Sequence, residues 1–399
     1  MLPKATKRHA ALLTAIRPTF KHFRSLAEAY HHPYRFPSGL HDSAYLKPDM
    51  PTKPLAIEDL KHVLTHAHGV FDQLRDATIF VTGGTGFFGH WLLESLLYAN
   101  DERHLQLRIT VLTRDAAAFR AKSPHISNHP AISLLEGDIK SFGFPTESHQ
   151  YILHAATDSG GQQANAPAYA LAESILEGTR HVLQFARETG ARRLLYTSTG
   201  AVYGRSTTLL ETPETYSGAP DPLQLSSSYD EAKRMAEHLC IAYSADQSFD
   251  AVIARCFAFI GPHLPLDQHF AIGNFLSAAL KNEFLHIKGD GTPRRSWLYM
   301  ADLAIWLWTM LVSGQRNRAY NVGSDEGMTI AEAARLVTTT LHPALPIQID
   351  GIPNPAAPLN SYVPDIRRAQ DELGLKVSIP LTEAIRRTAS WHGWQDSGQ

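Results

Sequence analysis

The chain has 399 residues, of which 44% are hydrophobic and 19% are charged, and its formal net charge at pH 7 is −2. A chain of this size can form one large two-lobed fold or two ordinary domains without disulfides. The balanced charge gives no reason to expect a nucleic-acid partner. The longest strongly apolar stretch, 304–312, is far shorter than the ~20 residues of a membrane-spanning helix. Cys240 and Cys256 form no metal or redox motif, which suits a cytoplasmic protein.

The first 75 residues are predicted to form an N-terminal extension. Residues 1–30 carry six basic side chains against one acid, Glu28, and their apolar part is too short for a secretory signal. We interpret them as a basic helix that docks on the core or on another subunit; a mitochondrial transit peptide is the alternative with the same composition. Five prolines in 31–55 indicate an extended linker, and 57–73 have helical periodicity. We expect residues 1–55 to be dispensable for catalysis.

Residues 76–260 alternate between strand-like and helical patterns, as is typical of a doubly wound parallel sheet. A short buried strand is expected over 77–82, directly before a glycine-rich turn. Further strand-like runs follow at 107–113, 132–135, 151–155, 193–198 and 251–255. Helical periodicity lies between them, most clearly over 166–188 and 227–244. We therefore predict a Rossmann-like α/β lobe here.

Residues 261–399 have a less regular pattern, with many prolines and glycines. Helices are expected near 329–341 and 381–392. We predict that this part is mainly a smaller, substrate-binding lobe, with the site in the cleft between the two lobes.

A glycine-rich turn, Gly83-Gly-Thr-Gly86-Phe-Phe-Gly89, follows the first strand and opens an apolar helix. Glycines at this spacing allow a tight turn, close approach of the backbone to a pyrophosphate, and close packing of helix on strand. The helix N-terminus offers N–H groups and its dipole to the phosphates. We therefore predict a dinucleotide site formed by Gly83, Gly86, Phe87, Phe88 and Gly89.

The choice between NAD and NADP depends on the end of the second strand. An acid that binds the adenosine ribose is usual there, but this chain has Thr113, followed by Arg114. An arginine can contact the 2′-phosphate of NADP, so NADP is slightly favoured over NAD. Asp115, one place later, could restore NAD binding or simply cap the following helix.

Tyr229 and Lys233 lie four residues apart on a predicted helix, so both side chains can point into the cofactor cleft. An ammonium close to a phenol is expected to lower the pKa of that phenol. The phenolate can then take a proton from a sugar hydroxyl while hydride leaves its carbon. Hydroxyls at 196–199, at the end of a predicted strand, lie where doubly wound folds bind ligands.

Together these features resemble the extended short-chain dehydrogenase/reductase family, and within it the nucleotide-sugar epimerases, dehydratases and decarboxylases. The resemblance covers residues 76–394. It implies catalytic roles for Thr199, Tyr229 and Lys233, with Ser198 as the less favoured alternative to Thr199, and it implies that Tyr229 and Lys233 also contact the cofactor. It implies four further cofactor contacts, at Asp138, Ile139, Ala155 and Ala156.

On the substrate side, the resemblance implies that Asn274 and Arg295 bind the diphosphate of a nucleotide-sugar. An arginine suits this role because its planar guanidinium binds two phosphate oxygens. The segment 229–237 looks especially like that of UDP-glucuronate decarboxylases.

The chain also departs from the family pattern. The 4,6-dehydratases have Asp-Glu immediately after the active threonine, and the decarboxylases have a glutamate at the second of these places. Here the two places hold Gly200 and Ala201, neither of which can exchange a proton. Ala258 and Ile175 stand where the family usually has asparagines. The cofactor chemistry therefore looks intact and the substrate side atypical.

These patterns predict hydride transfer at C4 of a nucleotide-sugar, as a 4-epimerase or a 4-ketoreductase. Decarboxylation of a UDP-glucuronate type of substrate is the first alternative and 4,6-dehydration the second. A non-catalytic dinucleotide-binding regulator is an alternative of another class. We expect the enzyme to be a homodimer. We expect no bound metal, because no acid or cysteine completes a ligand set around His62 and His66.

Overall fold

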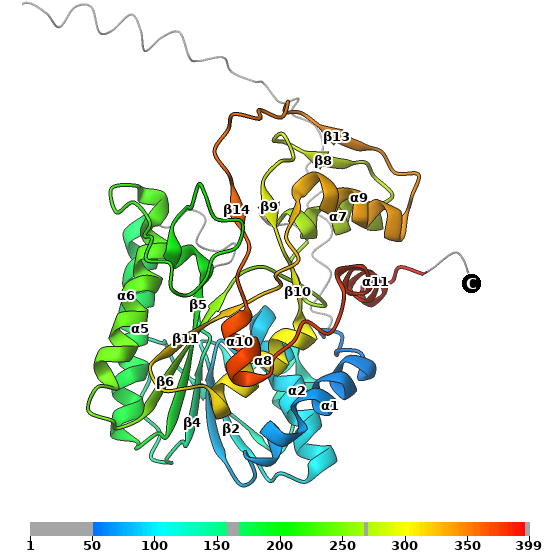
Figure 1. Ribbon diagram of the computed structural model, residues 1–399. Helices are drawn as coiled ribbons and strands as arrows, with labels where there is room; N and C mark the ends of the chain where they lie inside the picture. The colour runs from blue at the N-terminus through cyan, green and yellow to red at the C-terminus, as the bar shows by residue number, and fades with distance from the viewer. Residues whose placement is uncertain (1–50, 158–166, 267–269, 396–399) are drawn as a thin grey trace, which may run out of the picture. The chain divides into compact units, whose positions relative to one another are not determined.

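The computed structural model describes residues 51–157, 167–266 and 270–395 (Figure 1). The predicted basic helix and most of the proline-rich linker lie outside the described residues. Within the described ranges, no helix has both the length and the apolar character needed to cross a lipid bilayer.

A seven-stranded parallel sheet forms the centre of the fold, in the order β3-β2-β1-β4-β5-β6-β11. The strands are β1 (Thr78–Thr82), β2 (Arg108–Thr113), β3 (Ile132–Glu136), β4 (Tyr151–His154), β5 (Arg193–Thr199), β6 (Asp250–Cys256) and β11 (Arg318–Val322). The predicted Rossmann-like sheet is thus confirmed. The seventh strand, β11, comes from beyond residue 260 and pairs with β6, so part of the C-terminal sequence completes the sheet.

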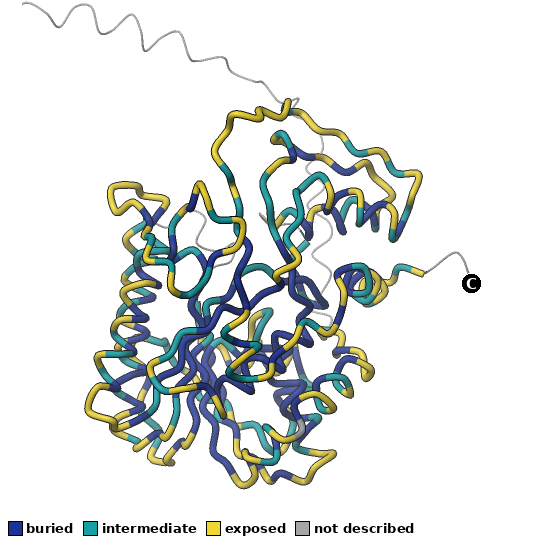
Figure 2. The backbone as a smooth tube through the Cα atoms, in the orientation of Figure 1, coloured by how far each residue is buried: buried dark blue, intermediate teal, exposed yellow. Residues whose placement is uncertain are grey.

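Helices cover both faces of the sheet. Successive side chains of a strand point to opposite faces, and the strands of this sheet carry apolar side chains on both. In β1, Ile79 and Val81 belong to one apolar cluster and Phe80 to the other. The first cluster lies under α1 (Ile57–Asp72), α2 (Phe87–Arg103) and α8 (Met300–Ser313). The second lies under α5 (Ala168–Glu188) and α6 (Ser228–Tyr243), which lie side by side in Figure 1. Figure 2 shows the sheet buried between these layers.

Short helices connect the outer strands of the sheet. Two of them, α3 (Ala116–Lys122) and α4 (Pro124–Ser127), join β2 to β3. A 3₁₀ turn over Gly200–Tyr203 follows β5 directly, and a second one, Leu225–Ser227, leads into α6.

The rest of the chain builds a smaller assembly of helices and very short strands above the sheet edge (Figure 1). Its helices are α7 (Ala271–Leu280), α9 (Ile330–Leu341) and α11 (Leu381–Trp391). Helix α10 (Arg367–Leu373) lies instead against β11 and α8, beside the central sheet (Figure 1). Three strand groups complete the smaller assembly: β7 (Phe259–Ile260) with β10 (Leu298–Tyr299), β8 (Leu285–Ile287) with β13 (Ile347–Ile349), and β9 (Arg294–Arg295) between β12 (Met328–Thr329) and β14 (Ser361–Tyr362). Helices α9 and α11 match the two helices predicted for this part.

The site lies at the carboxyl edge of the sheet, which follows from the strand register. Thr82 at the end of β1 stands opposite Leu112 of β2 and His154 of β4, and His154 stands opposite Tyr196 of β5. Because all these strands run in the same direction, the segments that follow them meet at one edge.

Candidate functional site

The glycine turn after β1 has the geometry of a pyrophosphate cradle. Gly83 has a positive φ of 74°, and a Cβ there would lie 2.5 Å from the Ala155 carbonyl oxygen. A Cβ on Gly89 would lie 2.3 Å from the Gly84 carbonyl. Gly86 caps α2 with no side-chain hydrogen bond, so the first N–H groups of the helix have no side-chain cap. Only glycine fits at 83 and 89, and the turn suits a dinucleotide.

Phe87 and Phe88 form the first turn of α2 and are half-buried. The ring of Phe88 packs edge-on against Phe259, with 5.1 Å between the ring centroids. This contact fixes the start of α2 against the C-terminal part of the chain, while both residues remain next to the glycine turn.

Ala155 and Ala156 follow β4 and lie against the end of β1. Their N–H groups donate to the Thr82 carbonyl (3.3 Å) and the Thr82 hydroxyl (3.1 Å). The same hydroxyl contacts His154 Nδ1 at 2.8 Å, and His154 Nε2 contacts the Thr179 hydroxyl on α5. These bonds place the two alanines directly beside the glycine turn, where the sequence predicted a cofactor contact.

Asp138, Ile139 and Arg114, three of the predicted cofactor residues, lie directly after strands β3 and β2. Asp138 follows β3, and its carboxylate accepts from the Lys140 N–H at 2.9 Å. Ile139 packs on Gly178 of α5, where a Cβ would lie 3.0 Å from its side chain. Arg114 is exposed directly after β2, and Asp115 caps α3 by accepting from the Ala118 N–H at 2.8 Å.

Lys233 is buried in the middle of the candidate catalytic cluster, with 2% of its surface exposed. Its Nζ donates to the Thr157 hydroxyl (2.7 Å) and to the Thr197 carbonyl (2.8 Å). The same Nζ lies 4.7 Å from the Tyr196 ring centroid and 6.0 Å from the Tyr229 ring centroid. Burial lowers the pKa of Lys233 to about 8.

The pKa of Tyr229 differs from the sequence expectation. We expected Lys233 to lower it, but burial raises it well above its ordinary value, and the neighbouring Tyr362, Cys256 and Asp230 add to the rise. A hydrogen bond with the Thr199 hydroxyl acts in the opposite direction. The physical reason is that the Lys233 ammonium donates to Thr157 and Thr197 rather than to the phenol, so desolvation of the phenolate dominates.

Tyr362 is a member of this cluster that the sequence did not reveal. It lies on β14, and its hydroxyl is 3.2 Å from the Thr199 hydroxyl. Its ring packs on Phe257, with 4.7 Å between centroids, and it stands opposite Arg295 in the register of β14 with β9. The cluster therefore holds two phenols, one on each side of Thr199.

Gly200 and Ala201 leave no acid at the start of the 3₁₀ turn, and the structure shows why a larger side chain is absent at 200. A Cβ on Gly200 would lie 2.6 Å from the Phe257 ring. The Ala201 N–H donates to the Thr199 hydroxyl at 3.2 Å. The Phe257 ring therefore occupies the space that a side chain at residue 200 would need.

The two predicted diphosphate residues do not lie in one cluster. The Arg295 guanidinium is 5.9 Å from the Tyr362 ring centroid and donates to the Asn360 side chain at 3.3 Å, and burial lowers its pKa. Asn274 is exposed on α7 and lines a hollow of about 450 Å³ together with Phe275, Ala278, Glu283, Phe284 and His286. Arg295 therefore lies next to Tyr362, whereas Asn274 lines a different hollow. Across the described ranges, no three His, Cys, Asp or Glu side chains are grouped so that they could hold a metal ion.

Comparison with known proteins gives a family. Residues 79–323 match the NAD dependent epimerase/dehydratase family. The chain belongs to this family. It is therefore an NAD-dependent enzyme of the epimerase/dehydratase type, in the extended short-chain dehydrogenase/reductase group, as the motifs indicated.

Individual family members are similar to this chain over most of its length. UDP-glucuronic acid decarboxylase 1 of Arabidopsis thaliana is 31% identical over 314 residues, which cover 78% of this chain and 69% of the plant protein. UDP-glucuronic acid decarboxylase 1 of Danio rerio is 28% identical over 313 residues, 78% of this chain and 72% of the fish protein. The structure of UDP-glucose 4-epimerase from Thermotoga maritima matches with a TM-score of 0.65 at 21% identity, over 79% of this chain and 98% of that one. That last similarity concerns the fold alone.

Proposed function

We propose that this enzyme oxidises C4 of a UDP-linked uronic acid and then releases its carboxyl group as carbon dioxide. The Thr199–Tyr229–Lys233 cluster beside the glycine turn supports the oxidation at C4. The relatives named as UDP-glucuronic acid decarboxylases favour decarboxylation over the 4-epimerase reading preferred from the sequence.

The cofactor would be held by the glycine turn, the α2 N-terminus and the ends of β3 and β4. A nicotinamide dinucleotide held there would supply the hydride acceptor, and later the hydride donor, for C4. Tyr229 exchanges the proton of the hydroxyl at C4, Thr199 hydrogen-bonds the same oxygen, and Lys233 holds the surrounding hydroxyl and carbonyl groups in place. Burial favours the neutral form of Tyr229, so the phenol must lose its own proton before it takes the one at C4, and the hydrogen bond with Thr199 favours that loss.

Loss of carbon dioxide needs little further help from the protein. Once C4 is a ketone, the C6 carboxylate is β to it, and the ketone accepts the electron pair when the C5–C6 bond breaks. This step requires no acid at 200 or 201. Dehydration across C5 and C6 needs a base and an acid at those atoms, and Gly200 and Ala201 supply neither.

Epimerisation or reduction at C4 is the second candidate, and one observation favours it. The decarboxylase glutamate expected after the active threonine is replaced by Ala201, and Phe257 closes the space at Gly200. A site with this composition still contains everything that hydride transfer at C4 requires.

Further features of the proposal concern binding and assembly. We propose that Arg295 and Asn274 hold the diphosphate of the substrate. We also propose that residues 76–260 carry the cofactor and residues 261–399 mainly the substrate, and that the enzyme is a cytoplasmic homodimer.

Arg114 carries a proposal on cofactor choice. Asp115 accepts the Ala118 N–H, so its carboxylate is engaged in capping α3, and Arg114 is the exposed residue next to it. We propose that Arg114 contacts the 2′-phosphate of NADP. Arg114→Ala should then weaken NADP more than NAD in a binding titration, and equal weakening of both would remove this role.

The main test uses the purified full-length protein with NAD or NADP, each in turn, and either UDP-glucuronate or UDP-glucose. NMR and mass spectrometry should show carbon dioxide loss and a UDP-pentose from UDP-glucuronate. Tyr229→Phe should lower turnover by about 10²–10⁴-fold while cofactor binding stays nearly unchanged. Tyr243→Phe, at the other end of α6, is the matched control. A C4-inverted hexose without loss of carbon dioxide would favour the epimerase instead.

A further inference from the structure

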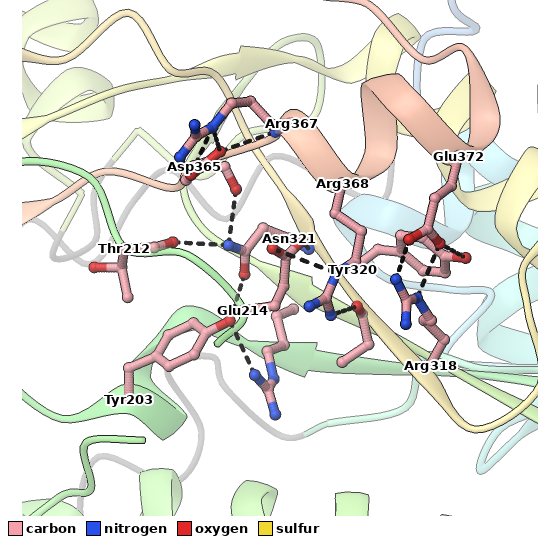
Figure 3. Close-up of polar contacts among 12 residues, drawn as sticks. Tyr203, Thr212, Glu214, Arg318, Tyr320, Asn321, Asp365, Arg367, Arg368 and Glu372 are labelled. Carbon is pink, nitrogen blue, oxygen red and sulfur yellow. Dashed lines mark hydrogen bonds and ion pairs between the residues drawn. The ribbon is translucent and has the colours of Figure 1, made fainter. Parts of the chain in front are cut away.

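The segment that directly follows Tyr362 is held by hydrogen bonds to other parts of the chain. The Thr212 N–H donates to the Val363 carbonyl at 2.9 Å, and the Asp365 N–H donates to the Thr212 carbonyl at 3.0 Å. Asn321 on β11 donates from its amide to the carbonyls of Thr212 (2.8 Å) and Asp365 (2.9 Å), as Figure 3 shows. The strand that carries the phenol is therefore held to the central sheet.

The proposed reaction needs a proton that the residues named so far do not provide. When carbon dioxide leaves, the electron pair of the broken C5–C6 bond remains on C5 and the C4 ketone as an enolate, and C5 must be protonated. Tyr229 serves the oxygen at C4, and Gly200 and Ala201 carry no exchangeable proton. Besides Tyr229, the titratable groups that interact with Tyr362 are Cys256, Asp230 and Arg295.

We propose that Tyr362 is a second acid of this active site and gives its phenolic proton to C5 after carbon dioxide has left. This inference rests on the proposed function. In the step, the O–H bond of Tyr362 breaks and a C5–H bond forms, so the enolate becomes the C4 ketone of a pentose. Tyr229 would return its proton to the C4 oxygen as that carbon is reduced again, and solvent would restore the proton on Tyr362.

The surroundings of Tyr362 suit a donor better than those of its rivals. Burial raises the pKa of Tyr362 to about 12, although the hydrogen bond with Thr199 and the Arg295 charge oppose the rise, so the phenol keeps its proton at neutral pH. Burial and Glu231 raise the pKa of Asp230 to about 6, which leaves most of this carboxyl ionised at pH 7. Cys256 is buried at the end of β6, and its thiol is a weak hydrogen-bond donor.

The test follows the reduced cofactor and the product separately in a single turnover with UDP-glucuronate. Tyr362→Phe should form reduced cofactor at nearly the wild-type rate, since oxidation at C4 precedes the step that Tyr362 serves. Product formation should fall by about 10²–10⁴-fold, so the reduced cofactor should persist. Tyr243→Phe should behave as wild type, and Asp230→Asn should retain product formation.

Each other outcome has a defined meaning. Equal loss of cofactor reduction and of product in Tyr362→Phe would assign Tyr362 only to positioning Thr199, and unchanged product formation would remove it from the chemistry; both overturn the proposal. Loss of product in Asp230→Asn with none in Tyr362→Phe would overturn it in favour of Asp230. If the wild type does not decarboxylate UDP-glucuronate, the proposed function fails and takes this inference with it.

Discussion

Burial controls the protonation of the candidate catalytic side chains. It raises the pKa of Tyr229 and Tyr362 and lowers the pKa of Lys233, so it favours the neutral form of all three groups. Thr199 is the one residue whose hydrogen bonds lower the pKa of both phenols. A hydroxyl that hydrogen-bonds to two half-buried phenols is therefore well placed to stabilise whichever of them gives up its proton.

Gly200 is the residue whose substitution should disturb this arrangement most directly. In Gly200→Ala the new methyl would lie 2.6 Å from the Phe257 ring, and that ring packs on Tyr362. We expect overpacking to lower the free energy of unfolding by about 1–3 kcal/mol and to lower turnover by displacing Tyr362. Thermal unfolding and steady-state rates measure the two effects.

Gly143→Ala is the control for that substitution, because a Cβ at Gly143 has no atom within 4 Å. It should leave stability and rate nearly unchanged. A Gly200→Ala enzyme with wild-type stability and wild-type turnover would show that Phe257 moves freely and that the tight contact has no consequence.

At the scale of elements, Asn321 on β11 joins three segments that are far apart in the sequence. Its side-chain oxygen accepts from the Tyr203 hydroxyl at 2.7 Å, and its side-chain amide donates to the carbonyls of Thr212 and Asp365 (Figure 3). Arg255 on β6 donates to the Tyr203 hydroxyl and pairs with Glu237 on α6 at 2.7 Å. This network connects the end of the sheet with the strand that carries Tyr362.

Asn321→Leu should therefore weaken both the fold and the site. The substitution keeps the branched shape but leaves the Asp365 carbonyl without its donor and the Tyr203 hydroxyl without its acceptor, at about 1–3 kcal/mol for each unsatisfied group. The Thr212 carbonyl keeps the hydrogen bond from the Asp365 N–H. We expect a lower unfolding temperature and a loss of turnover greater than the loss of cofactor binding. Asn354→Ala, in an exposed loop, is the control. Equal effects of the two substitutions would argue against an anchoring role.

The sequence predicts those elements whose signals are local. Strands β1 to β6 and helices α5 and α6 follow from hydrophobic periodicity, and the glycine turn follows from spacing, because only glycine fits at Gly83 and Gly89. Tyr362 has no such signal. It lies on a two-residue strand and meets Thr199 from 163 positions away, so only the folded chain brings the pair together.

The substrate side was harder to predict for the same physical reason. The sequence shows that Gly200 lacks a carboxylate, but not that Phe257 fills the space in its place. The sequence predicts that Lys233 lies near Tyr229. Whether the lysine charge or desolvation dominates the pKa of Tyr229 depends on how deeply the two side chains are buried. Pairwise spacing predicts which groups are neighbours along a helix, and tertiary packing decides which of their interactions dominates.

At the scale of the whole molecule, two buried histidines connect separate elements next to the glycine turn. His154 contacts hydroxyls on β1 and α5, and burial lowers its pKa to about 3. His90, in the first turns of α2, contacts the Gly86 carbonyl and the Ser123 hydroxyl, and burial together with nearby His263 lowers its pKa to about 4. Both side chains are neutral in the folded protein at neutral pH.

These shifts predict an acid-sensitive fold. A histidine that is neutral when folded takes up a proton near pH 6.5 once the chain unfolds, so its stabilising contribution is complete above pH 6.5 and is lost as the pH falls toward the folded pKa. Each such histidine should lower the free energy of unfolding by about 1.4 kcal/mol per pH unit below its unfolded pKa. The effect of Glu94, whose pKa is held at about 2, begins only below pH 4.5. Asp230, whose pKa burial and Glu231 raise to about 6, acts in the opposite direction below pH 6 and offsets one histidine. Together His90 and His154 should still dominate between pH 6.5 and 5.

His154→Gln tests this account, because its amide can still hydrogen-bond at the Thr179 side but cannot take up a proton near neutral pH. Urea unfolding at several pH values between 6.5 and 5 should give a slope that is smaller than the wild-type slope by up to one proton, or about 1.4 kcal/mol per pH unit. His66→Gln, at an exposed histidine of α1, should leave the slope unchanged. A His154→Gln protein with the wild-type slope would mean that His154 is not held neutral, and that the bonds from β1 to α5 do not depend on its protonation.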